Sequence, residues 1–397
     1  MAPDLRLLGE ALLLRSRVQR RDDWNRDHLL EYQQRALGQL LRHAQSRSRY
    51  WAETLPAGPV TSLVGLPVLT KTTLMARWYQ ICTEPRLTRD QVIDRLARTQ
   101  EDRIDPGHAW HGRWWAAATG GTTGRRAVLA WNRWEWAQIL ASYARVNDWA
   151  DVRVDLRHPL RTAIVSSRNP THQSAVVGAS LRSRLVPTLR LDARASIDDL
   201  VRDLNGFRPR LLVAYASMVG PLAAAQREGR LCIAPERLVS ASEVLPAAAR
   251  SAAEEAWGKD IVVDSYAATE TASIASTCAE GGRHLYEDFV IIESVDDDYA
   301  PVPAGTTGTR LLVTPLFART LPLIRYELTD AVCLTDRTCP CGRPFALLDT
   351  VEGRTEDTLT MHGSAGPVTV HPLVFHTALE GAAPLGWQVE QQDDRAL

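Results

Sequence analysis

Short apolar runs alternate with helical stretches from about residue 160 onward, and this alternation constrains the fold more than any other feature of the chain. The runs cover residues 162–165, 211–214, 261–263 and 289–292, and each has the length of a buried strand. Strands interleaved with helices predict an α/β fold with crossover connections. Between residues 305 and 335 the helical period disappears, and runs at 308–314, 324–326 and 331–334 predict a small antiparallel β subdomain.

One segment near the N-terminus predicts a helix, and the composition argues against several classes of partner. Residues 26–50 place apolar side chains at helical spacing, and a Pro/Gly cluster at 56–59 ends this amphipathic segment. The first residues fit neither a signal peptide nor a transmembrane helix, because charges interrupt every apolar run. Lys and Arg total 46 against 47 for Asp and Glu, which argues against nucleic-acid and membrane partners. We expect a soluble, cytoplasmic protein with a small-molecule ligand.

The most specific local signal is the sequence TGGTTGRR at residues 119–126, called the Thr/Gly loop below. Its glycines let the backbone bend tightly, so that hydroxyls and main-chain N–H groups converge on one point, which suits a polyphosphate. The spacing differs from that of the GxxxxGK[ST] loop. The candidate phosphate-binding residues are Thr119, Gly120, Gly121, Thr122, Thr123, Gly124 and Arg125. The alternative is an ordinary polar turn between strands.

A second signal lies at residues 264–270, directly after the apolar run at 261–263. We expect it at the carboxyl end of a strand, where open α/β sheets bind their ligands. Tyr266 can stack on a base, Thr269 can hold a phosphate, and Glu270 can hold Mg²⁺ together with substrate phosphates. The alternative is a Thr–Glu pair that caps a helix.

A third signal combines an acceptor with a donor near the end of the chain. Asp330 has the acceptor geometry for a ribose diol, and the planar fork of Arg354 can bind ribose or phosphate oxygens. The alternative is an Asp in a surface turn and an Arg in a salt bridge.

Three thiols and an imidazole form a candidate metal site. The residues Cys278, His284, Cys339 and Cys341 supply a ligand set suited to a closed, tetrahedral structural Zn²⁺ site, in which Cys333 can replace one ligand. The alternative is that these side chains pack or face solvent without a metal. A zinc hydrolase is disfavoured, because four protein ligands leave no position for a metal-bound water.

The order of these segments resembles the phenylacetate-CoA ligase branch of the adenylate-forming enzymes. The family motifs SSGTTGKP, YGATE, IRYRTGD and GRxDD are similar to the Thr/Gly loop and to residues 266–270, 324–330 and 353–357. The sequence LPVLTK at residues 66–71 is also similar, and Ser242 and Glu243 fall where the family has an adenine-facing turn. The resemblance covers most of the chain.

The resemblance implies a large N-terminal adenylation domain over residues 1–352 and a hinge at residues 353–357. The family continues with a small α+β C-terminal domain of about 100 residues. We expect residues 353–397 to hold the hinge and an incomplete form of that domain, in a truncated or naturally shortened enzyme.

The implied activity is ATP-dependent conversion of a small, aromatic carboxylic acid to an acyl-adenylate, followed by transfer to CoA. ATP/AMP, Mg²⁺ and CoA are the implied cofactors, and a homodimer is expected. By position, the acid pocket is assigned to Asn169, His172, Tyr215, Ser217, Ala241 and Ala267, and the nucleotide site gains Ser242, Glu243 and Arg325. Glu270, Arg354 and the threonines and arginine of the Thr/Gly loop are the expected catalytic residues.

Three positions depart from the family pattern. Arg125 replaces the lysine of the loop and keeps its charge, whereas Ala267 and Thr329 replace glycines and add side chains near the nucleotide. Two other functions remain open. The adenylate can pass to another acceptor in a natural-product pathway, such as an amine, a hydroxyl, a carrier-protein thiol or an inorganic nitrogen species. Alternatively, the chain is a non-catalytic scaffold that kept the fold.

Overall fold

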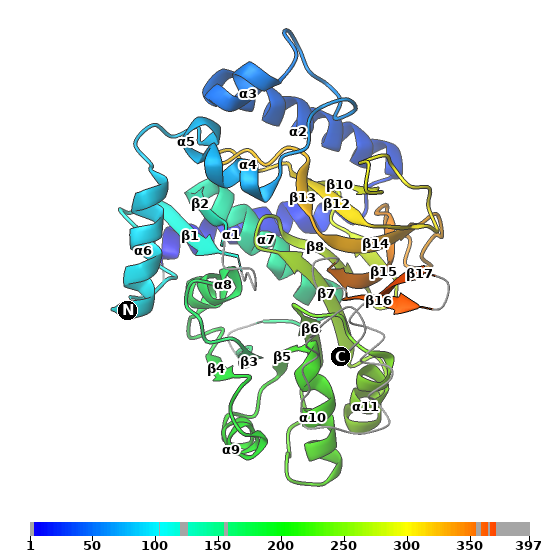
Figure 1. Ribbon diagram of the computed structural model, residues 1–397. Coiled ribbons are helices and arrows are strands. Elements are labelled where there is room, and N and C mark those ends of the chain that lie inside the picture. Colours follow the sequence, from blue (N-terminus) through cyan, green and yellow to red (C-terminus); the bar gives the residue numbers. More distant parts are fainter. Residues whose placement is uncertain are drawn as a thin grey trace.

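The computed structural model describes residues 4–102, 104–119, 126–154, 158–354, 359–363 and 366–370, with side chains up to residue 353. Helices dominate the first hundred residues, and strands dominate after residue 260 (Figure 1). The helices are α1 (Leu5–Arg21), α2 (Arg26–Arg47), α3 (Arg49–Thr54), α4 (Lys71–Ala76), α5 (Trp78–Ile81), α6 (Arg89–Glu101), α7 (Arg133–Trp149), α8 (Gln173–Leu181), α9 (Ile197–Phe207), α10 (Ala216–Arg227) and α11 (Ala247–Trp257).

The largest element of the fold is a ten-stranded mixed sheet with the order β11-β14-β15-β9-β8-β7-β6-β5-β3-β4. Its parallel half runs from β7 to β4, and β7 pairs antiparallel with β8, which begins the other half. The strands of this sheet are β3 (Thr162–Ser166), β4 (Thr188–Asp192), β5 (Leu211–Tyr215), β6 (Arg237–Ala241), β7 (Val262–Ala268), β8 (Ala272–Thr277), β9 (Arg283–Leu285), β11 (Thr307–Gly308), β14 (Asp330–Thr335) and β15 (Leu347–Arg354).

Smaller antiparallel sheets complete the fold. One has the order β10-β12-β13, and the two others are hairpins. Their strands are β10 (Val290–Val295), β12 (Arg310–Pro315) and β13 (Tyr326–Leu328), β1 (Trp114–Ala118) with β2 (Val128–Asn132), and β16 (Leu359–Gly363) with β17 (Gly366–Val370). The expected α/β fold with a small antiparallel β subdomain is thus confirmed.

The parallel half of the sheet buries its apolar runs against α9, α10 and α11, which lie in the lower part of Figure 1. Leu212 and Leu238 are fully buried on this face, together with Leu204 of α9 and Leu222 of α10. A second, larger cluster joins the N-terminal helices to α7, the β1–β2 hairpin and the antiparallel strands. Because these strands run parallel, their carboxyl ends lie together at one edge of the sheet, where open α/β sheets bind ligands.

The N-terminal helices pack against segments that follow them by more than two hundred residues. The indole N–H of Trp51 donates to the carbonyl of Pro322 at 2.9 Å, and the N–H of Leu69 donates to the carbonyl of Arg325 at 3.0 Å. The N–H of Glu327 in turn donates to the carbonyl of Leu69 at 3.0 Å. The segment that resembles LPVLTK thus lies against β13.

A buried ion-pair network holds α1 to the rest of the core. Asp288 accepts from Arg145 of α7 at 2.6 and 2.8 Å and from Arg21 of α1 at 2.9 Å. The side chain of Asp288 is inaccessible to solvent and that of Arg145 is 1% exposed. Each charge therefore has a partner, as burial requires.

Several elements differ from the sequence expectations in their bounds. The helix expected at residues 26–50 divides into α2 and α3 at Ser48, whose hydroxyl caps α3. No element was expected at α1, because exposed leucines mask its buried face. The strand β15 passes through the expected domain boundary, and residues 355–358, 364–365 and 371–397 lie outside the described residues, so the two-domain division stays a prediction. Within the described parts of the chain, none of the helices combines the length and apolarity needed to cross a membrane.

Candidate active site

The base of the Thr/Gly loop is closed by hydrogen bonds between its two ends. The N–H of Thr119 donates to the carbonyl of Ala127 at 2.9 Å, and the Thr119 hydroxyl accepts from the N–H of Ala127 at 3.0 Å. Thr119 directly follows β1 and is 8% exposed. The other predicted loop residues, 120–125, lie outside the described part of the chain. The structure thus places the ends of a loop between two strands here, and the phosphate-binding role stays a prediction.

The second predicted segment forms the end of β7 and a tight turn into β8. Tyr266 and Ala267 belong to β7, while Thr269 and Glu270 form the turn, where the N–H of Thr271 donates to the carbonyl of Ala268 at 3.2 Å. Glu270 is 8% exposed. Because a strand rather than a helix follows the turn, the helix-capping alternative for the Thr–Glu pair is wrong.

The segment from the end of β3 to the start of α8 connects the base of the Thr/Gly loop with the turn between β7 and β8. The N–H of Ala118 donates to the carbonyl of Thr171 at 2.9 Å, and the amide of Gln173 donates to the carbonyl of Thr269 at 2.8 Å. The side-chain oxygen of Asn169 accepts from the N–H and the hydroxyl of Thr171 at 3.0 and 2.7 Å, which fixes the segment internally. Gln173 was not predicted as a site residue, because a lone glutamine carries no motif.

His172 lies in this connecting segment as the residue before α8. It is half-buried, and burial lowers the pKa of its imidazole below the usual value. The positive charges of Arg126 and Arg190 lower this pKa further, in that order. The ring is therefore neutral at pH 7 and can either donate or accept a hydrogen bond.

Residues at the carboxyl ends of β5 and β6 lie next to one another and next to β7. Tyr215 pairs with Ala241 across the two parallel strands, and Ala241 pairs with Ser265 of β7. The N–H of Ser217, in the first turn of α10, donates to the carboxylate of Glu243 at 2.8 Å. Ser242 has a φ of 71°, which turns the chain sharply after β6. Of the residues predicted for the acid pocket and the adenine-facing turn, the structure thus groups Tyr215, Ser217, Ala241, Ser242 and Glu243 at the carboxyl ends of β5 and β6, and their roles stay predictions.

Asp330 and Arg354 are direct partners in the register of β14 and β15. Asp330 is 9% exposed and begins a strand, so the alternative of an Asp in a surface turn is wrong. The strands place the two residues side by side, although the side chain of Arg354 lies outside the described part of the chain.

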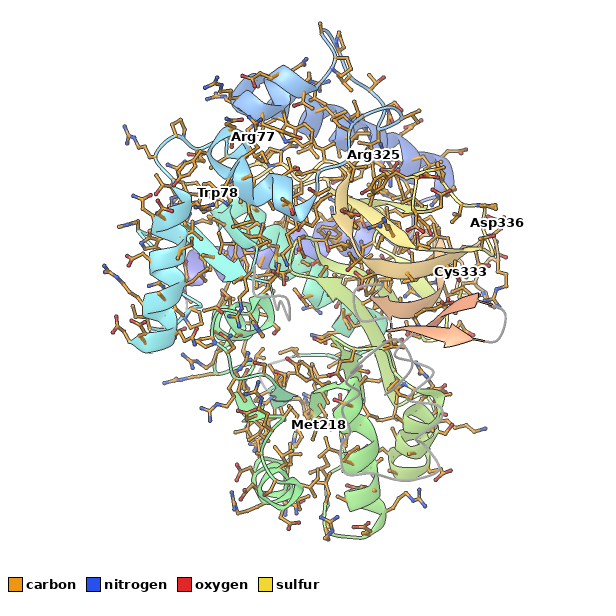
Figure 2. All side chains as sticks on the ribbon, viewed as in Figure 1. Arg77, Trp78, Met218, Arg325, Cys333 and Asp336 are labelled. Carbon is orange, nitrogen blue, oxygen red and sulfur yellow. The ribbon has the colours of Figure 1, made fainter. Side chains whose placement is uncertain are left out.

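The guanidinium of Arg325, predicted to bind the nucleotide, contacts other residues of the chain in this structure. Its Nε lies 3.2 and 3.1 Å from the two carboxylate oxygens of Glu293, and its Nη1 donates to the carbonyl of Leu66. The residue is 8% exposed and lies beside β13 in the upper part of the molecule (Figure 2). The guanidinium would have to leave these partners to contact a nucleotide.

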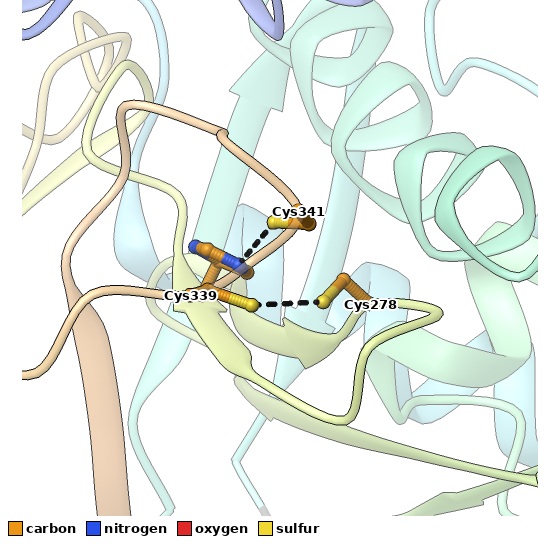
Figure 3. Close-up of side chains that lie close together, drawn as sticks. Cys278, Cys339 and Cys341 are labelled. Atoms are coloured by element: carbon orange, nitrogen blue, oxygen red, sulfur yellow. Dashed lines mark hydrogen bonds between the residues drawn. The ribbon is translucent and has the colours of Figure 1, made fainter.

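The four predicted metal ligands come together in one cluster, called the Cys/His cluster (Figure 3). Their ligand atoms all lie within 4.8 Å of one another. The Sγ atoms of Cys278 and Cys339 are 3.6 Å apart, and Sγ of Cys341 lies 3.1 Å from Nε2 of His284. Two thiolates on one tetrahedral zinc ion would be about 3.8 Å apart, given Zn–S bonds of about 2.3 Å. The donor set and the spacing therefore fit zinc.

Contacts around the cluster orient its imidazole. Nδ1 of His284 lies 2.9 Å from the carbonyl of Phe345, which can only accept, so Nδ1 carries the proton and Nε2 presents a lone pair to the cluster. Cys278 and His284 are buried. Cys333 is not part of the cluster, since its thiol lies 3.5 Å from the carbonyl of Leu334. His284 is buried rather than at the surface, and the four side chains lie together, while the bound metal stays a prediction.

Known proteins similar to this chain support the fold and the resemblance. No family model matches the chain. Phenylacetate-coenzyme A ligase from Thermus thermophilus is 31% identical over 185 residues, a stretch that covers 44% of this chain and 40% of that ligase. The matched stretch is thus less than half of that relative.

Solved structures of 2-hydroxyisobutyryl-CoA ligase share the fold over a longer span. The postadenylation state of that enzyme matches with a TM-score of 0.67 and 19% identity, covering 92% of this chain and 75% of the ligase. An open conformation in complex with an adenylate and CoA matches with a TM-score of 0.62 and 20% identity, covering 88% and 79%. The chain therefore has the fold of the adenylate-forming CoA ligases and is similar in sequence to the phenylacetate-CoA ligase branch, as its motifs predicted.

Proposed function

We propose that this chain activates a small, aromatic carboxylic acid with ATP, forming an acyl-adenylate that is passed to CoA. The observation that carries the proposal is the pair of hydrogen bonds from Ala118 to Thr171 and from Gln173 to Thr269. They bring the base of the Thr/Gly loop, the connecting segment and the Thr269–Glu270 turn to one edge of the sheet. Elements suited to phosphate, acid and metal thus converge, as the transfer of an adenylyl group requires.

In this mechanism the acid's carboxylate attacks the α-phosphate of ATP in line, and pyrophosphate leaves. The residues Thr119, Thr122, Thr123 and Arg125 of the Thr/Gly loop hold the β- and γ-phosphates. Glu270 would hold Mg²⁺, which neutralises charge on the phosphates. No residue of the chain acts as a nucleophile, so positioning and charge stabilisation account for the catalysis.

The nucleoside would be held by residues on both halves of the large sheet. Tyr266 stacks on the adenine, which Ser242 and Glu243 face from the end of β6, and Thr269 contacts a phosphate. Asp330 accepts from the ribose hydroxyls, and its register partner Arg354 donates to ribose or phosphate oxygens.

The acid would lie against the ends of β5, β6 and β7. The methyl side chains of Ala241 and Ala267 leave room for a flat ring, with Tyr215 and Ser217 beside it. Neutral His172 can hydrogen-bond a ring substituent or the carboxylate. An aromatic acid is therefore the substrate class that the lining supports.

A second proposal concerns the Cys/His cluster. Cys278, His284, Cys339 and Cys341 would hold a structural Zn²⁺ that ties the β8–β9 turn to the loop before β15. Native mass spectrometry and metal analysis of the purified chain test this. We expect one zinc per chain, loss of that zinc in Cys341→Ala, and retention in the control Cys232→Ala, whose thiol is exposed. Equal zinc content in both variants would exclude the site.

The adenylation test is acid-dependent exchange of labelled pyrophosphate into ATP, with benzoates, hydroxy- and aminobenzoates, phenylacetates and cinnamates. Exchange with one class identifies the acid, and product analysis with and without CoA then distinguishes CoA from an amine, hydroxyl, carrier-protein thiol or inorganic nitrogen acceptor. No exchange, together with no binding of ATP, would favour the scaffold function. Size-exclusion chromatography with light scattering tests the expected homodimer.

A further inference from the structure

Gln173 occupies a buried position between three elements that the proposed reaction uses or depends on. It is the first residue of α8 and is 3% exposed. Its amide Nε2 donates to the carbonyl of Thr269 at 2.8 Å, and its Oε1 lies 3.1 Å from the hydroxyl of Tyr143 on α7. The side chain therefore connects α7 and α8 with the turn between β7 and β8.

The partners determine the orientation of the amide. The carbonyl of Thr269 can only accept, so the NH₂ group must face it, and the Tyr143 hydroxyl then donates to Oε1. Burial raises the pKa of Tyr143 far above its usual value, so the hydroxyl keeps its proton. A flipped amide would place two acceptors face to face in a buried site, which is costly.

The contact acts on the peptide group that precedes Glu270. The carbonyl of Thr269 and the N–H of Glu270 belong to one planar unit, so a bond that holds this oxygen also fixes the peptide plane to which the Cα of Glu270 is attached and thereby restricts the positions that its side chain can reach. The turn is tight, and Ala272 at its end has a φ of 63°, which leaves the backbone few other conformations. Rotation of the 269–270 peptide is thus the backbone freedom that the hydrogen bond from Gln173 removes.

The segment that contains Gln173 also contacts the strand that leads into the Thr/Gly loop. Two residues before Gln173, the carbonyl of Thr171 accepts from the N–H of Ala118 at 2.9 Å, next to the start of the Thr/Gly loop. The distance between the loop base and the Thr269–Glu270 turn is therefore set by three consecutive residues, 171–173.

We propose that Gln173 is a positioning residue that aims Glu270 at the metal–nucleotide complex. This inference rests on the proposed adenylation activity for its kinetic consequences, but its structural part does not. Gln173 itself does not contact substrate; it acts through the Thr269 carbonyl. Loss of its amide should therefore weaken the use of Mg²⁺ and ATP while leaving the recognition of the acid unchanged.

The test compares Gln173→Met, which keeps the length of the side chain but cannot donate, with Gln138→Met as a control at a buried glutamine of α7. In pyrophosphate exchange, we expect Gln173→Met to raise the KM for MgATP about tenfold or more and to leave the KM for the acid within about twofold. Tyr143→Phe should give a smaller change in the same direction. In the double variant with Gln173→Met it should add nothing, because its effect passes through the amide.

A second readout separates this inference from the proposed function. Hydrogen exchange measured by mass spectrometry on a peptide spanning residues 264–277 should become faster in Gln173→Met and not in Gln138→Met, whether or not the chain adenylates any acid. If the wild-type chain shows no pyrophosphate exchange but this difference is present, the structural part of the inference, that Gln173 holds the Thr269–Glu270 turn, stands and the proposed activity falls. An unchanged rate of hydrogen exchange in that peptide of a folded Gln173→Met protein would overturn the inference. Equal effects on the KM for MgATP and the KM for the acid would also overturn it.

Discussion

Gly282 lies so close to Cys339 that a Cβ atom at position 282 would be 2.7 Å from the cysteine Sγ. Such a contact is shorter than packed atoms tolerate, so Gly282→Ala should push Cys339 away from the other ligands of the Cys/His cluster. We expect weaker zinc retention and a lower melting temperature. The control is Gly206→Ala in α9, where nothing lies within 4 Å of the added methyl. Full zinc retention in both variants, by metal analysis after dialysis against a chelator, would contradict the expectation.

The ion-pair network at Asp288 should make stability depend on pH in the acid range. Burial alone would raise the pKa of Asp288, but Arg145 and Arg21 outweigh this and hold the pKa below its usual value. A lowered folded-state pKa means that the stabilisation is present above the unfolded-state pKa of about 3.9 and is lost as pH falls through the lower folded-state value.

Asp288→Asn leaves the buried guanidinium of Arg145 with only the more distant carboxylate of Asp22, at 3.7 Å, and should cost about 3–5 kcal/mol at pH 7. Urea unfolding from pH 7 down to about pH 2, which spans the range below the unfolded-state pKa, should also show a flatter loss of stability toward acid in this variant. Asp198→Asn is the control, because that carboxylate pairs with Arg230 at the surface, where its side chain is 87% exposed. A similar loss in both variants would contradict a role for burial.

Glu270→Gln removes the charge that we assign to the metal while keeping the shape of the side chain. If adenylation is the activity, acid-dependent pyrophosphate exchange should fall by roughly 100-fold or more, with partial recovery at high Mg²⁺. Glu255→Gln serves as the control, since that exposed carboxylate pairs with Arg227 on the surface. Exchange that is unchanged in Glu270→Gln would remove this residue from the site.

The imidazole of His172 should titrate below its usual pKa of about 6.5. Burial is the largest cause, and Arg126 and Arg190 add to it. Arg126→Gln should therefore raise the pKa of His172, as followed by NMR of ring-labelled histidine, whereas Arg194→Gln at an exposed turn should not. A pKa above 6.5 in the unaltered chain would show that the ring is more exposed than the structure has it.

The parallel strands β3, β5 and β7 could be predicted from their apolar runs because most of their residues at these runs are buried, whereas β4 and β6 were not predicted. The runs at 162–165 and 211–214 became β3 and β5 with one further residue each. By contrast, β8 (Ala272–Thr277) is built mostly from alanine and serine, with only Ile274 and Thr277 as strand formers, and it was not predicted. Its burial depends on neighbouring strands of the sheet, and a short stretch of sequence around β8 does not reveal these neighbours.

The candidate site was predictable where residue type determines the chemistry. The thiols and imidazole of the Cys/His cluster were identified by type and spacing, although the fold has to bring together Cys278 and Cys339, which are 61 residues apart. Gln173 could not be identified, since its importance lies in one hydrogen bond to a main-chain carbonyl 96 residues away. Arg325 is a case in which a motif suggested a role that its contacts do not support directly. It falls in a segment that resembles a nucleotide-binding motif, but its guanidinium contacts Glu293 and Leu66 in this structure.

The hydrogen bond from Trp51 to Pro322 joins residues 271 positions apart. During synthesis at about 5–20 residues per second, α3 would emerge from the ribosome on the order of 10–50 s before the segment that receives its indole. The N–H of Leu69 likewise lacks its acceptor until Arg325 has been synthesised. The surfaces of α3 and of the segment around Leu69 that pack on residues 322–327 thus stay uncovered until most of the chain has been made, and we expect the need for chaperones to be greatest during this interval.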